Sequence, residues 1–245
     1  MAGLLSRLLG RKRREAPLRC SAVVPAAGSA SRMKGRDKLL LPLDEQPVLV
    51  RTLGALSACP YITEIIVVTR EDLVVPIGGL CRDCALEKVR KIVVGGATRT
   101  HSVLAGLEEL DPGAELVAIH DGARPLVSQE VLETVIRRAA QCGAAAPAVP
   151  VKDTVKRARD GLVLDTPDRG ELFAVQTPQV FQTDLIRAAL ARALEEGAVL
   201  TDDCSAVERL GIGVALTQGD YRNLKITTPE DMAVAEALLH WEEEP

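Results

Sequence analysis

A loop of small and basic residues follows the first apolar stretch of the chain, and its composition suits a polyphosphate. The loop lies between Ser21 and Lys38, carries Gly28 among alanines and serines, and contains Arg32. Small side chains let backbone N–H groups approach an anion closely, while the two basic residues add full positive charge. No Gly-Lys-Ser/Thr follows and only Gly28 is in register, so neither a Walker A loop nor a dinucleotide fingerprint is present. These residues predict a phosphate-binding loop, with a plain strand-to-helix turn as the alternative.

A second group of candidate residues follows an apolar segment, in the sequence His120-Asp-Gly-Ala-Arg-Pro125. An aspartate at the carboxyl end of a buried parallel strand faces the ligand crevice. There Asp121 can hold Mg²⁺ together with phosphate oxygens, and Arg124 can bind a phosphate bidentately. The alternative is that Asp121 caps the following turn and pairs with Arg124.

Two further segments supply polar groups. After the Gly95-Gly96 pair, which lets the backbone approach a planar base or a sugar, Ser102 can hydrogen-bond to such a ligand. A turn followed by a helix cap explains the same spacing equally well. Near the end of the chain, Lys225 lies between the last predicted strand and the last predicted helix.

Together these groups suit nucleotidyl transfer, in which an acceptor oxygen attacks the α-phosphorus of a nucleoside triphosphate and pyrophosphate leaves. Catalysis of this kind depends on positioning and charge neutralisation. An acceptor phosphate, whose second pKa is about 6, is already anionic near neutral pH and needs no general base. The chain has three histidines and no Ser-His-Asp arrangement, and we expect His120 to be an orienting or buried residue.

Alternating strands and helices must position these residues. Short apolar strands between helices predict an α/β fold with a mostly parallel sheet covered by helices on both faces. Ligands of such sheets bind at the carboxyl ends of the strands. Strands are expected at 22–24, 64–69, 91–94, 115–120, 144–149 and 213–217. Helices are expected at 47–58, 99–110, 128–141, 183–196, 202–210 and 229–241.

One segment interrupts this alternation. Residues 151–166 predict a β-hairpin, because Asp160-Gly161 is a strong two-residue turn signal. A two-stranded hairpin is only marginally stable alone and has to pack against something. We interpret it as a protruding β-arm, residues 150–173, that embraces a second subunit. The alternative is a hairpin folded back onto its own domain.

Composition restricts the class of protein. Of the 245 residues, 47% are hydrophobic and 2% aromatic, and the formal net charge is −4. Low aromatic content and negative charge argue against general nucleic-acid binding. Six scattered cysteines indicate a reduced, cytoplasmic protein. We expect a basic, disordered leader over 1–19, one domain over 20–240 and an acidic tail over 241–245; contact of the leader with an anionic membrane surface is the less favoured interpretation.

Several segments, taken in order, make the chain similar to a known family. They are Val23–Lys38, Gly95-Gly96 with Ser102–Gly106, His120–Pro125, Pro150–Lys156, Thr177–Gln179, Thr201–Asp203 and Asn223–Thr227. From Cys20 to His240 the chain resembles the 2-C-methyl-D-erythritol 4-phosphate cytidylyltransferase family. The resemblance implies a homodimer with a Rossmann-like core and an exchanged β-arm. It also implies CTP and a sugar-alcohol phosphate, methylerythritol 4-phosphate, as substrates, and Mg²⁺ or another divalent cation as cofactor.

The resemblance also implies roles for particular residues. Those implied in catalysis, by stabilising charge at the α-phosphate or positioning the acceptor, are Arg32, Lys38, Arg169 and Lys225. Those implied in nucleotide binding are Pro25, Ala26, Ala27, Gly28, Gly96 and Ser102. Those implied in acceptor binding are Asp121, Arg124, Thr154, Arg169 and Lys225, with Asp121 also serving the metal. Thr154 and Arg169 would reach the acceptor phosphate from the partner's arm.

The chain departs from the family pattern at two single positions and in a slightly shorter loop between Arg32 and Lys38. Leu39 stands where a glutamine is common, and Ala97 stands where a polar residue often follows the glycines. A ribitol-5-phosphate cytidylyltransferase, with the same fold, nucleotide and chemistry, is the nearest alternative, although such proteins tend to carry Ala-Gly-Gly in the first loop. A non-catalytic nucleotide-binding regulator is the second alternative, and the intact set of charged residues argues against it.

Overall fold

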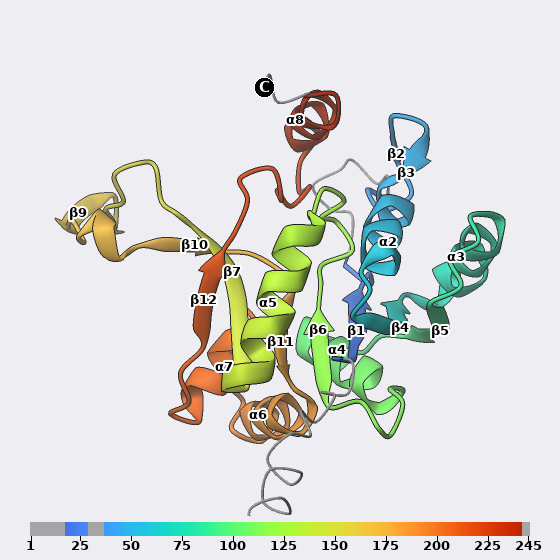
Figure 1. Ribbon diagram of the computed structural model, residues 1–245. Helices are drawn as coiled ribbons and strands as arrows, with labels where there is room; N and C mark the ends of the chain where they lie inside the picture. The colour runs from blue at the N-terminus through green and yellow to red at the C-terminus, as the bar shows by residue number, and fades with distance from the viewer. Residues whose placement is uncertain (1–17, 29–36, 242–245) are drawn as a thin grey trace, which may run out of the picture.

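A central eight-stranded sheet organises the residues that the computed structural model describes, 18–28 and 37–241 (Figure 1). The strands are β1 (Cys20–Pro25), β4 (Ile62–Thr69), β5 (Val89–Val94), β6 (Leu116–Ile119), β7 (Ala144–Pro150), β10 (Phe173–Val175), β11 (Gln179–Gln182) and β12 (Ala215–Gln218). Their order is β10-β7-β11-β6-β1-β4-β5, and β12 also pairs with β7. Outside the sheet, β2 (Pro42–Leu43) and β3 (Gln46–Pro47) form a short antiparallel pair.

Most neighbouring strands are parallel, as the sequence predicts. β1 pairs in parallel with β4 and β6, β4 with β5, and β7 with β12. β11 runs antiparallel to β6 and β7, and β10 runs antiparallel to β7. Neither β10 nor β11 is predicted from the sequence, because these short segments become strands through pairing with β7 and β6, which are distant in the sequence.

Helices cover both faces of the sheet (Figure 1). α2 (Val48–Ala58), α3 (Glu71–Asp83) and α5 (Gln129–Cys142) pack into one apolar cluster, and α4 (Arg99–Glu108), α6 (Thr183–Glu195) and α7 (Cys204–Arg209) pack into the other. In β1, Ala22 and Val24 belong to the first cluster and Val23 to the second, as expected for a strand buried on both sides. The predicted α/β fold is confirmed.

Local sequence explains several helix boundaries. Ser128 at the start of α5 and Thr228 at the start of α8 (Pro229–Leu239) each accept a hydrogen bond from a backbone N–H of the first turn. α3 is not predicted, because Pro76 and two glycines lie within it and disfavour a helix interior. Burial of Leu73 and Ile77 against the sheet stabilises α3 despite them. None of the helices described is long and apolar enough to cross a membrane.

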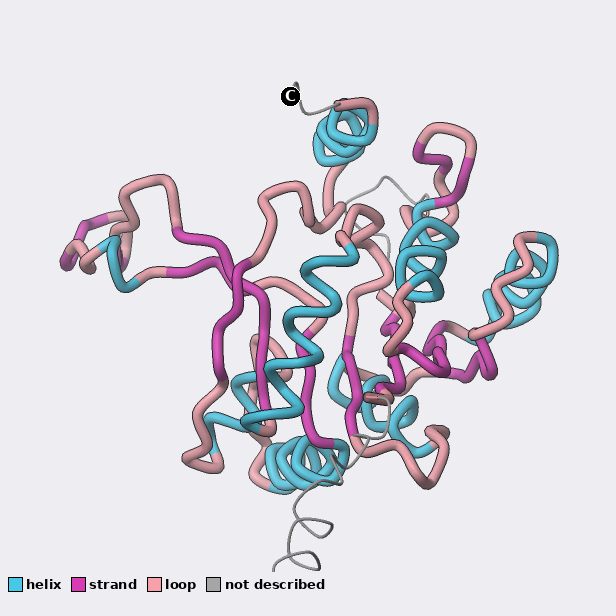
Figure 2. Tube along the Cα trace, in the orientation of Figure 1, coloured by secondary structure: helices cyan, strands magenta, loops and turns pink. Residues whose placement is uncertain are grey.

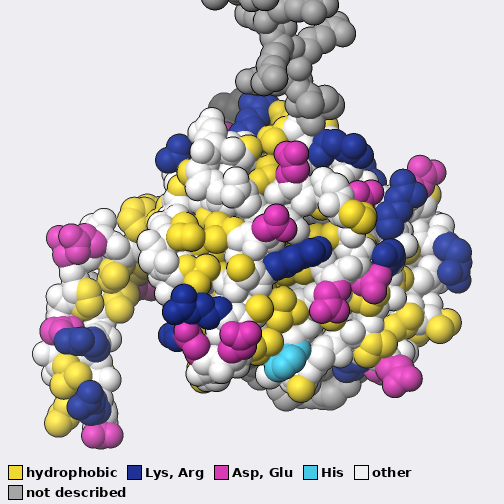
Figure 3. Space-filling model, turned by 90° about the horizontal axis from the view of Figure 1, so that it is seen from below, with side chains coloured by type: hydrophobic (Ala, Val, Ile, Leu, Met, Phe, Trp, Pro, Cys, Tyr) yellow, Lys and Arg dark blue, Asp and Glu magenta, His cyan; other side chains and the backbone are white. Residues whose placement is uncertain are grey.

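The predicted hairpin is present and projects from the sheet as an arm (Figures 1 and 2). β8 (Arg157–Arg159) and β9 (Leu162–Asp165) pair across Asp160 and Gly161, both of which have positive φ. A single 3-10 turn, η2 (Arg169–Glu171), leads back to β10. The apolar side chains of β9 are exposed, Leu162 by 73%, and Figure 3 shows apolar surface along the arm. The part of the chain that the structure describes therefore leaves these apolar side chains largely uncovered.

Candidate active site

A cavity of about 380 Å³ lies at the carboxyl ends of the parallel strands β1, β5 and β6. It is lined by residues from four segments that are far apart in the sequence. From the predicted set it gathers Pro25, Ala26, Ala27, Gly28, Lys38, Gly96, Ser102, Asp121 and Lys225. Arg32 lies outside the described residues. The position of the cavity is the one expected for a ligand of a parallel α/β sheet.

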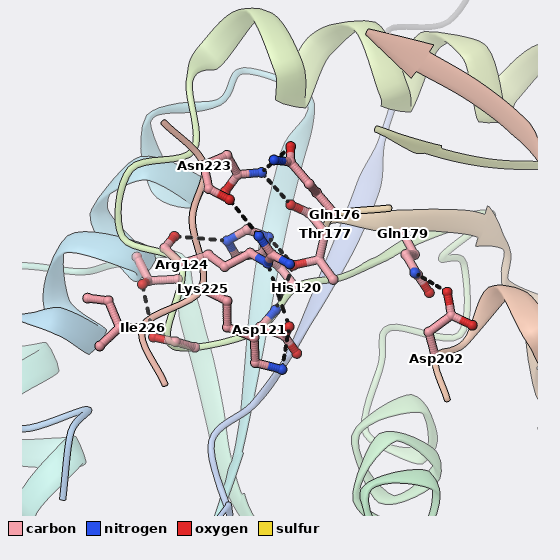
Figure 4. Close-up of polar contacts among 12 residues, drawn as sticks. His120, Asp121, Arg124, Gln176, Thr177, Gln179, Asp202, Asn223, Lys225 and Ile226 are labelled. Atoms are coloured by element: carbon pink, nitrogen blue, oxygen red, sulfur yellow. Dashed lines mark hydrogen bonds and ion pairs between the residues drawn. The ribbon is translucent and has the colours of Figure 1, made fainter. Parts of the chain in front are cut away.

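Asp121 is surrounded by three cationic side chains, and two of them, Arg124 and Lys225, are labelled in Figure 4. Its Oδ2 lies 2.9 Å from Nζ of Lys225 and 3.7 Å from Nε of Arg124, and its Oδ1 lies 3.8 Å from a guanidinium nitrogen of Arg99. Burial raises the pKa of Asp121, but Lys225, Arg99 and Arg124 together outweigh that effect and hold this pKa below its ordinary value. The carboxylate is therefore ionised at neutral pH.

His120 is fully buried and is hydrogen-bonded through both ring nitrogens (Figure 4). Its Nδ1 lies 3.1 Å from Oγ1 of Thr177, and its Nε2 lies 3.2 Å from the carbonyl oxygen of Arg124. Because a carbonyl can only accept, Nε2 carries the proton and Nδ1 accepts from the threonine hydroxyl. Thr177 Oγ1 in turn accepts from the backbone N–H of Asp121 at 3.1 Å. His120 thus braces the loop that carries Asp121, as an orienting residue.

The charge state of His120 makes the stability of the fold dependent on pH. Burial lowers the pKa of His120 from 6.5 to about 4, so the folded state holds it neutral. Below about pH 6.5 the unfolded chain binds a proton at His120 that the folded chain excludes. The free energy of unfolding is therefore unaffected above about pH 6.5 and falls by about 3 kcal/mol as the pH is lowered towards 4. We expect the free energy of unfolding, measured with urea at several pH values, to fall with pH in this way in the parent. In His120→Gln it should depend less steeply on pH. The exposed His240→Gln is the control and should keep the parental slope; equal slopes in all three would contradict the prediction.

Two glycines shape the wall of the cavity next to α4. A Cβ on Gly95 would lie 2.6 Å from Oγ of Ser102, and a Cβ on Gly96 would collide with the Cβ of His101. Ser102 Oγ itself donates to the carbonyl oxygen of Thr98 at 3.0 Å. The Gly-Gly pair is therefore a close backbone approach that lets the start of α4 line the cavity.

Lys38 and Leu39 occupy different environments. Nζ of Lys38 donates to the carbonyl oxygen of Ile226 at 2.8 Å, which ties the first loop to the segment that carries Lys225. Leu39 is 4% exposed and packs in an apolar cluster. The departure from the family pattern at Leu39 thus serves packing.

Three of the predicted site residues that the structure describes do not line the cavity. Arg124 is largely buried behind Asp121, where it donates to the carbonyl oxygen of Asn223 at 2.5 Å. Thr154 and Arg169 lie exposed on the arm, and Arg169 donates to the carbonyl oxygen of Lys152 at 3.0 Å. Within one chain the structure does not bring these two arm residues to the cavity.

Sequence reasoning missed a set of polar residues that support the site. Arg99 lines the cavity and makes two hydrogen bonds to the buried Asp203. Asn223 donates to the carbonyl oxygen of Thr177 at 2.9 Å. Asp203 and Asn223 fall within segments that carry the family resemblance, which is a signal that they matter, but nothing in the segments indicates which pairs meet.

The donor set suits a divalent cation only if the substrate supplies most of its ligands. Among the described residues lining the cavity, Asp121 is the only carboxylate, and no three acidic, histidine or cysteine side chains in the described ranges form a metal-binding group. Mg²⁺ is commonly held by one or two carboxylates together with substrate phosphates and waters. An ionised Asp121 beside the predicted phosphate-binding loop fits that pattern.

Comparison with known proteins gives a consistent result. A model of the 2-C-methyl-D-erythritol 4-phosphate cytidylyltransferase family matches residues 20–241. A protein of that name from Caldanaerobacter subterraneus subsp. tengcongensis is 48% identical over 226 residues, covering 89% of this chain and 98% of the relative.

Solved structures agree with this family in fold. The 4-diphosphocytidyl-2C-methyl-D-erythritol synthase from Anaerococcus prevotii is 35% identical with a TM-score of 0.80, covering 92% of this chain and 97% of that one. The 2-C-methyl-D-erythritol 4-phosphate cytidylyltransferase from Thermus thermophilus is 34% identical with a TM-score of 0.74, covering 89% and 98%. With the family model matching residues 20–241 and these relatives similar in sequence and fold, the chain belongs to the 2-C-methyl-D-erythritol 4-phosphate cytidylyltransferase family.

Proposed function

We propose that this protein transfers CMP from CTP to 2-C-methyl-D-erythritol 4-phosphate, giving 4-diphosphocytidyl-2-C-methyl-D-erythritol and pyrophosphate for non-mevalonate isoprenoid synthesis. The observation that carries the proposal is the single cavity that gathers the small-residue loop, Lys38, Asp121 and Lys225. Family membership over residues 20–241 supports the choice of nucleotide and acceptor. It disfavours the ribitol phosphate and regulator alternatives.

In the proposed reaction, an oxygen of the acceptor phosphate attacks the α-phosphorus of CTP. The new P–O bond forms as the bond to the bridging oxygen of the β-phosphate breaks, and the electron pair leaves on pyrophosphate. Lys38, together with Arg32 in the first loop, neutralises the charge that develops on the α-phosphate. The acceptor is already anionic, so no side chain has to remove a proton.

The acceptor end of the site is assigned to Asp121 and Lys225. Lys225 holds Oδ2 of Asp121 at 2.9 Å, which leaves the ionised carboxylate oriented to accept hydrogen bonds from acceptor hydroxyl groups. The nucleotide end is assigned to Ala26, Ala27, Gly96 and Ser102, whose backbone and hydroxyl groups also line the cavity. Mg²⁺ bound by the triphosphate and Asp121 would supply further charge neutralisation.

We also propose a homodimer in which each arm, residues 150–173, completes the partner's site. The exposed apolar residues of β9 favour packing against a second subunit. Thr154 and Arg169, which lie on the arm, would then approach the acceptor phosphate in the neighbouring cavity. We propose that residues 20–240 form the catalytic domain and that the protein is cytoplasmic. We propose no part in the reaction for the basic leader over 1–19 or for the acidic tail over 241–245.

Pyrophosphate release tests the proposed function. The purified full-length chain is incubated with CTP and Mg²⁺, with methylerythritol 4-phosphate and ribitol 5-phosphate offered separately. Release with the first acceptor alone is the expected result. Release with ribitol 5-phosphate alone would keep the chemistry and change the substrate. CTP binding without release from either acceptor would refute the proposal.

A further inference from the structure

Arg99, the first residue of α4, is held by an aspartate that lies 104 residues further along the chain. Its two terminal nitrogens donate to Oδ1 and Oδ2 of Asp203 at 2.8 and 2.6 Å. This two-point contact fixes the plane of the guanidinium, which a lysine could not reproduce. Asp203 is 1% exposed, whereas the Arg99 side chain remains about one-third exposed and lines the cavity.

Asp203 is itself held rigidly from the sheet. Oε1 of Gln179, in β11, accepts from the backbone N–H groups of Asp203 and Cys204 at 3.0 Å each. The side-chain nitrogen of Gln179 donates to Oδ2 of Asp202 at 2.7 Å. The position of Arg99 is therefore fixed through Asp203 by a strand of the central sheet.

Arg99 also faces Asp121, through the same terminal nitrogen that donates to Oδ2 of Asp203. Its nitrogen lies 3.8 Å from Oδ1 of Asp121, while Lys225 and Arg124 approach Oδ2. The carboxylate is thus held between cations on both of its oxygens. Without Arg99, the attraction of the two cations on the Oδ2 side would be unopposed and would turn the carboxylate.

The charge of Arg99 is already compensated by Asp203. Three of the five N–H donors of Arg99 are not used by Asp203, so the pair reduces the net charge that Arg99 offers a phosphate and not its number of donors. A buried ion pair also contributes little to folding, because apolar residues of similar volume are often as stabilising or more so. What the pair supplies is a fixed position for the Arg99 guanidinium, close to Oδ1 of Asp121.

We propose that Arg99 is a positioning residue for the acceptor end of the site, fixed by Asp203 against Oδ1 of Asp121 and withdrawn by it from phosphate binding. This role rests on the cytidylyl transfer proposed above, in which Asp121 orients the acceptor.

The decisive test replaces both partners at once. In the double variant Arg99→Met with Asp203→Leu, neither partner leaves the other's charge unpaired, so the melting temperature should equal or exceed that of the parent. We expect CTP affinity, measured by calorimetry without acceptor, to stay within about twofold. Since a small misplacement of a reacting group costs up to about 10²-fold, kcat/KM for the acceptor should fall about 10- to 100-fold.

A single substitution separates positioning from charge. Asp203→Asn keeps the shape of the side chain but frees the charge of Arg99, so CTP should bind severalfold more tightly while kcat/KM for the acceptor falls. Asp44→Asn is the matched control, because Asp44 pairs with Arg51 at 3.2 Å away from the cavity. It should match the parent in both measurements.

Three results would overturn the proposal. A double variant with parental kcat/KM for the acceptor would show that the pair positions nothing. A double variant that binds CTP at least tenfold more weakly would show that Arg99 binds phosphate directly. Unchanged or weaker CTP binding by Asp203→Asn would show that Asp203 withholds no charge. Absence of pyrophosphate release by the parent would instead refute the proposed function, and the CTP affinity of Asp203→Asn would still test the charge argument.

Discussion

Replacing Lys38 by alanine is expected to lower kcat about 10²- to 10³-fold while the protein stays folded. Lys38 lies at the end of the first loop and lines the cavity, and its Nζ donates a hydrogen bond to the carbonyl oxygen of Ile226 at 2.8 Å. Removing one preorganised group that stabilises developing charge typically costs a factor of this size. Loss of the anchoring hydrogen bond costs only about 1 kcal/mol of stability. Steady-state pyrophosphate release and thermal unfolding measure the two effects.

Lys88→Ala is the matched control for this prediction. Nζ of Lys88 also donates to a backbone carbonyl oxygen at 2.8 Å, that of Cys59, but Lys88 does not line the cavity. It should lose a similar amount of stability and keep the parental kcat. If both variants lost turnover to the same extent, Lys38 would have no special part in the reaction.

Arg169→Ala is expected to lower kcat/KM for the acceptor about 10²-fold and to leave CTP affinity unchanged. Arg169 lies on the arm, away from the cavity of its own chain, so its effect should arise in the partner's site. A charge-assisted contact with phosphate accounts for a loss of this order. Arg159→Ala, an exposed arginine on the same arm, should behave like the parent. Acceptor and CTP titrations separate the two constants.

Mixed dimers test whether the arm acts across subunits. A chain with Lys38→Ala keeps a working arm, and a chain with Arg169→Ala keeps a working cavity. Co-expression should therefore restore one good site in each heterodimer, which is about a quarter of parental activity if the subunits assemble at random. If heterodimers form but activity is not restored, Arg169 acts in the site of its own subunit.

The sequence predicts the parts of this structure that depend on local pattern. The apolar strands β1, β4 and β6 and the amphipathic α5 are found where their periodicities place them. α3 was hidden because Pro76 argues against a helix, and only packing of its apolar face on the sheet overrides that preference. The sequence does not predict β10 and β11, because they become strands by pairing with distant strands and not through their own composition.

The same division holds in the site. Lys38, Asp121 and Lys225 could be identified because each follows a recognisable strand or loop. The contacts of Arg99 with Asp203, and of His120 with Thr177, could not, because each joins segments more than 50 residues apart. Geometry of that kind follows from the order of strands in the sheet, which local sequence does not encode.

The distribution of charge around the cavity has a consequence for how quickly substrate is captured. Among the residues that the structure describes, the cations there are Lys38, Arg99, Arg124 and Lys225, and the carboxylates are Asp121 and Asp203. The chain as a whole carries −4, so a polyanion is repelled at long range and attracted close to these cations. We expect kcat/KM for CTP to fall as salt rises from about 0.01 to 0.15 M, where the screening length shrinks from about 30 to about 8 Å, while kcat stays nearly constant. The same cations that hold the Asp121 carboxylate would then also determine the rate at which the nucleotide meets the site.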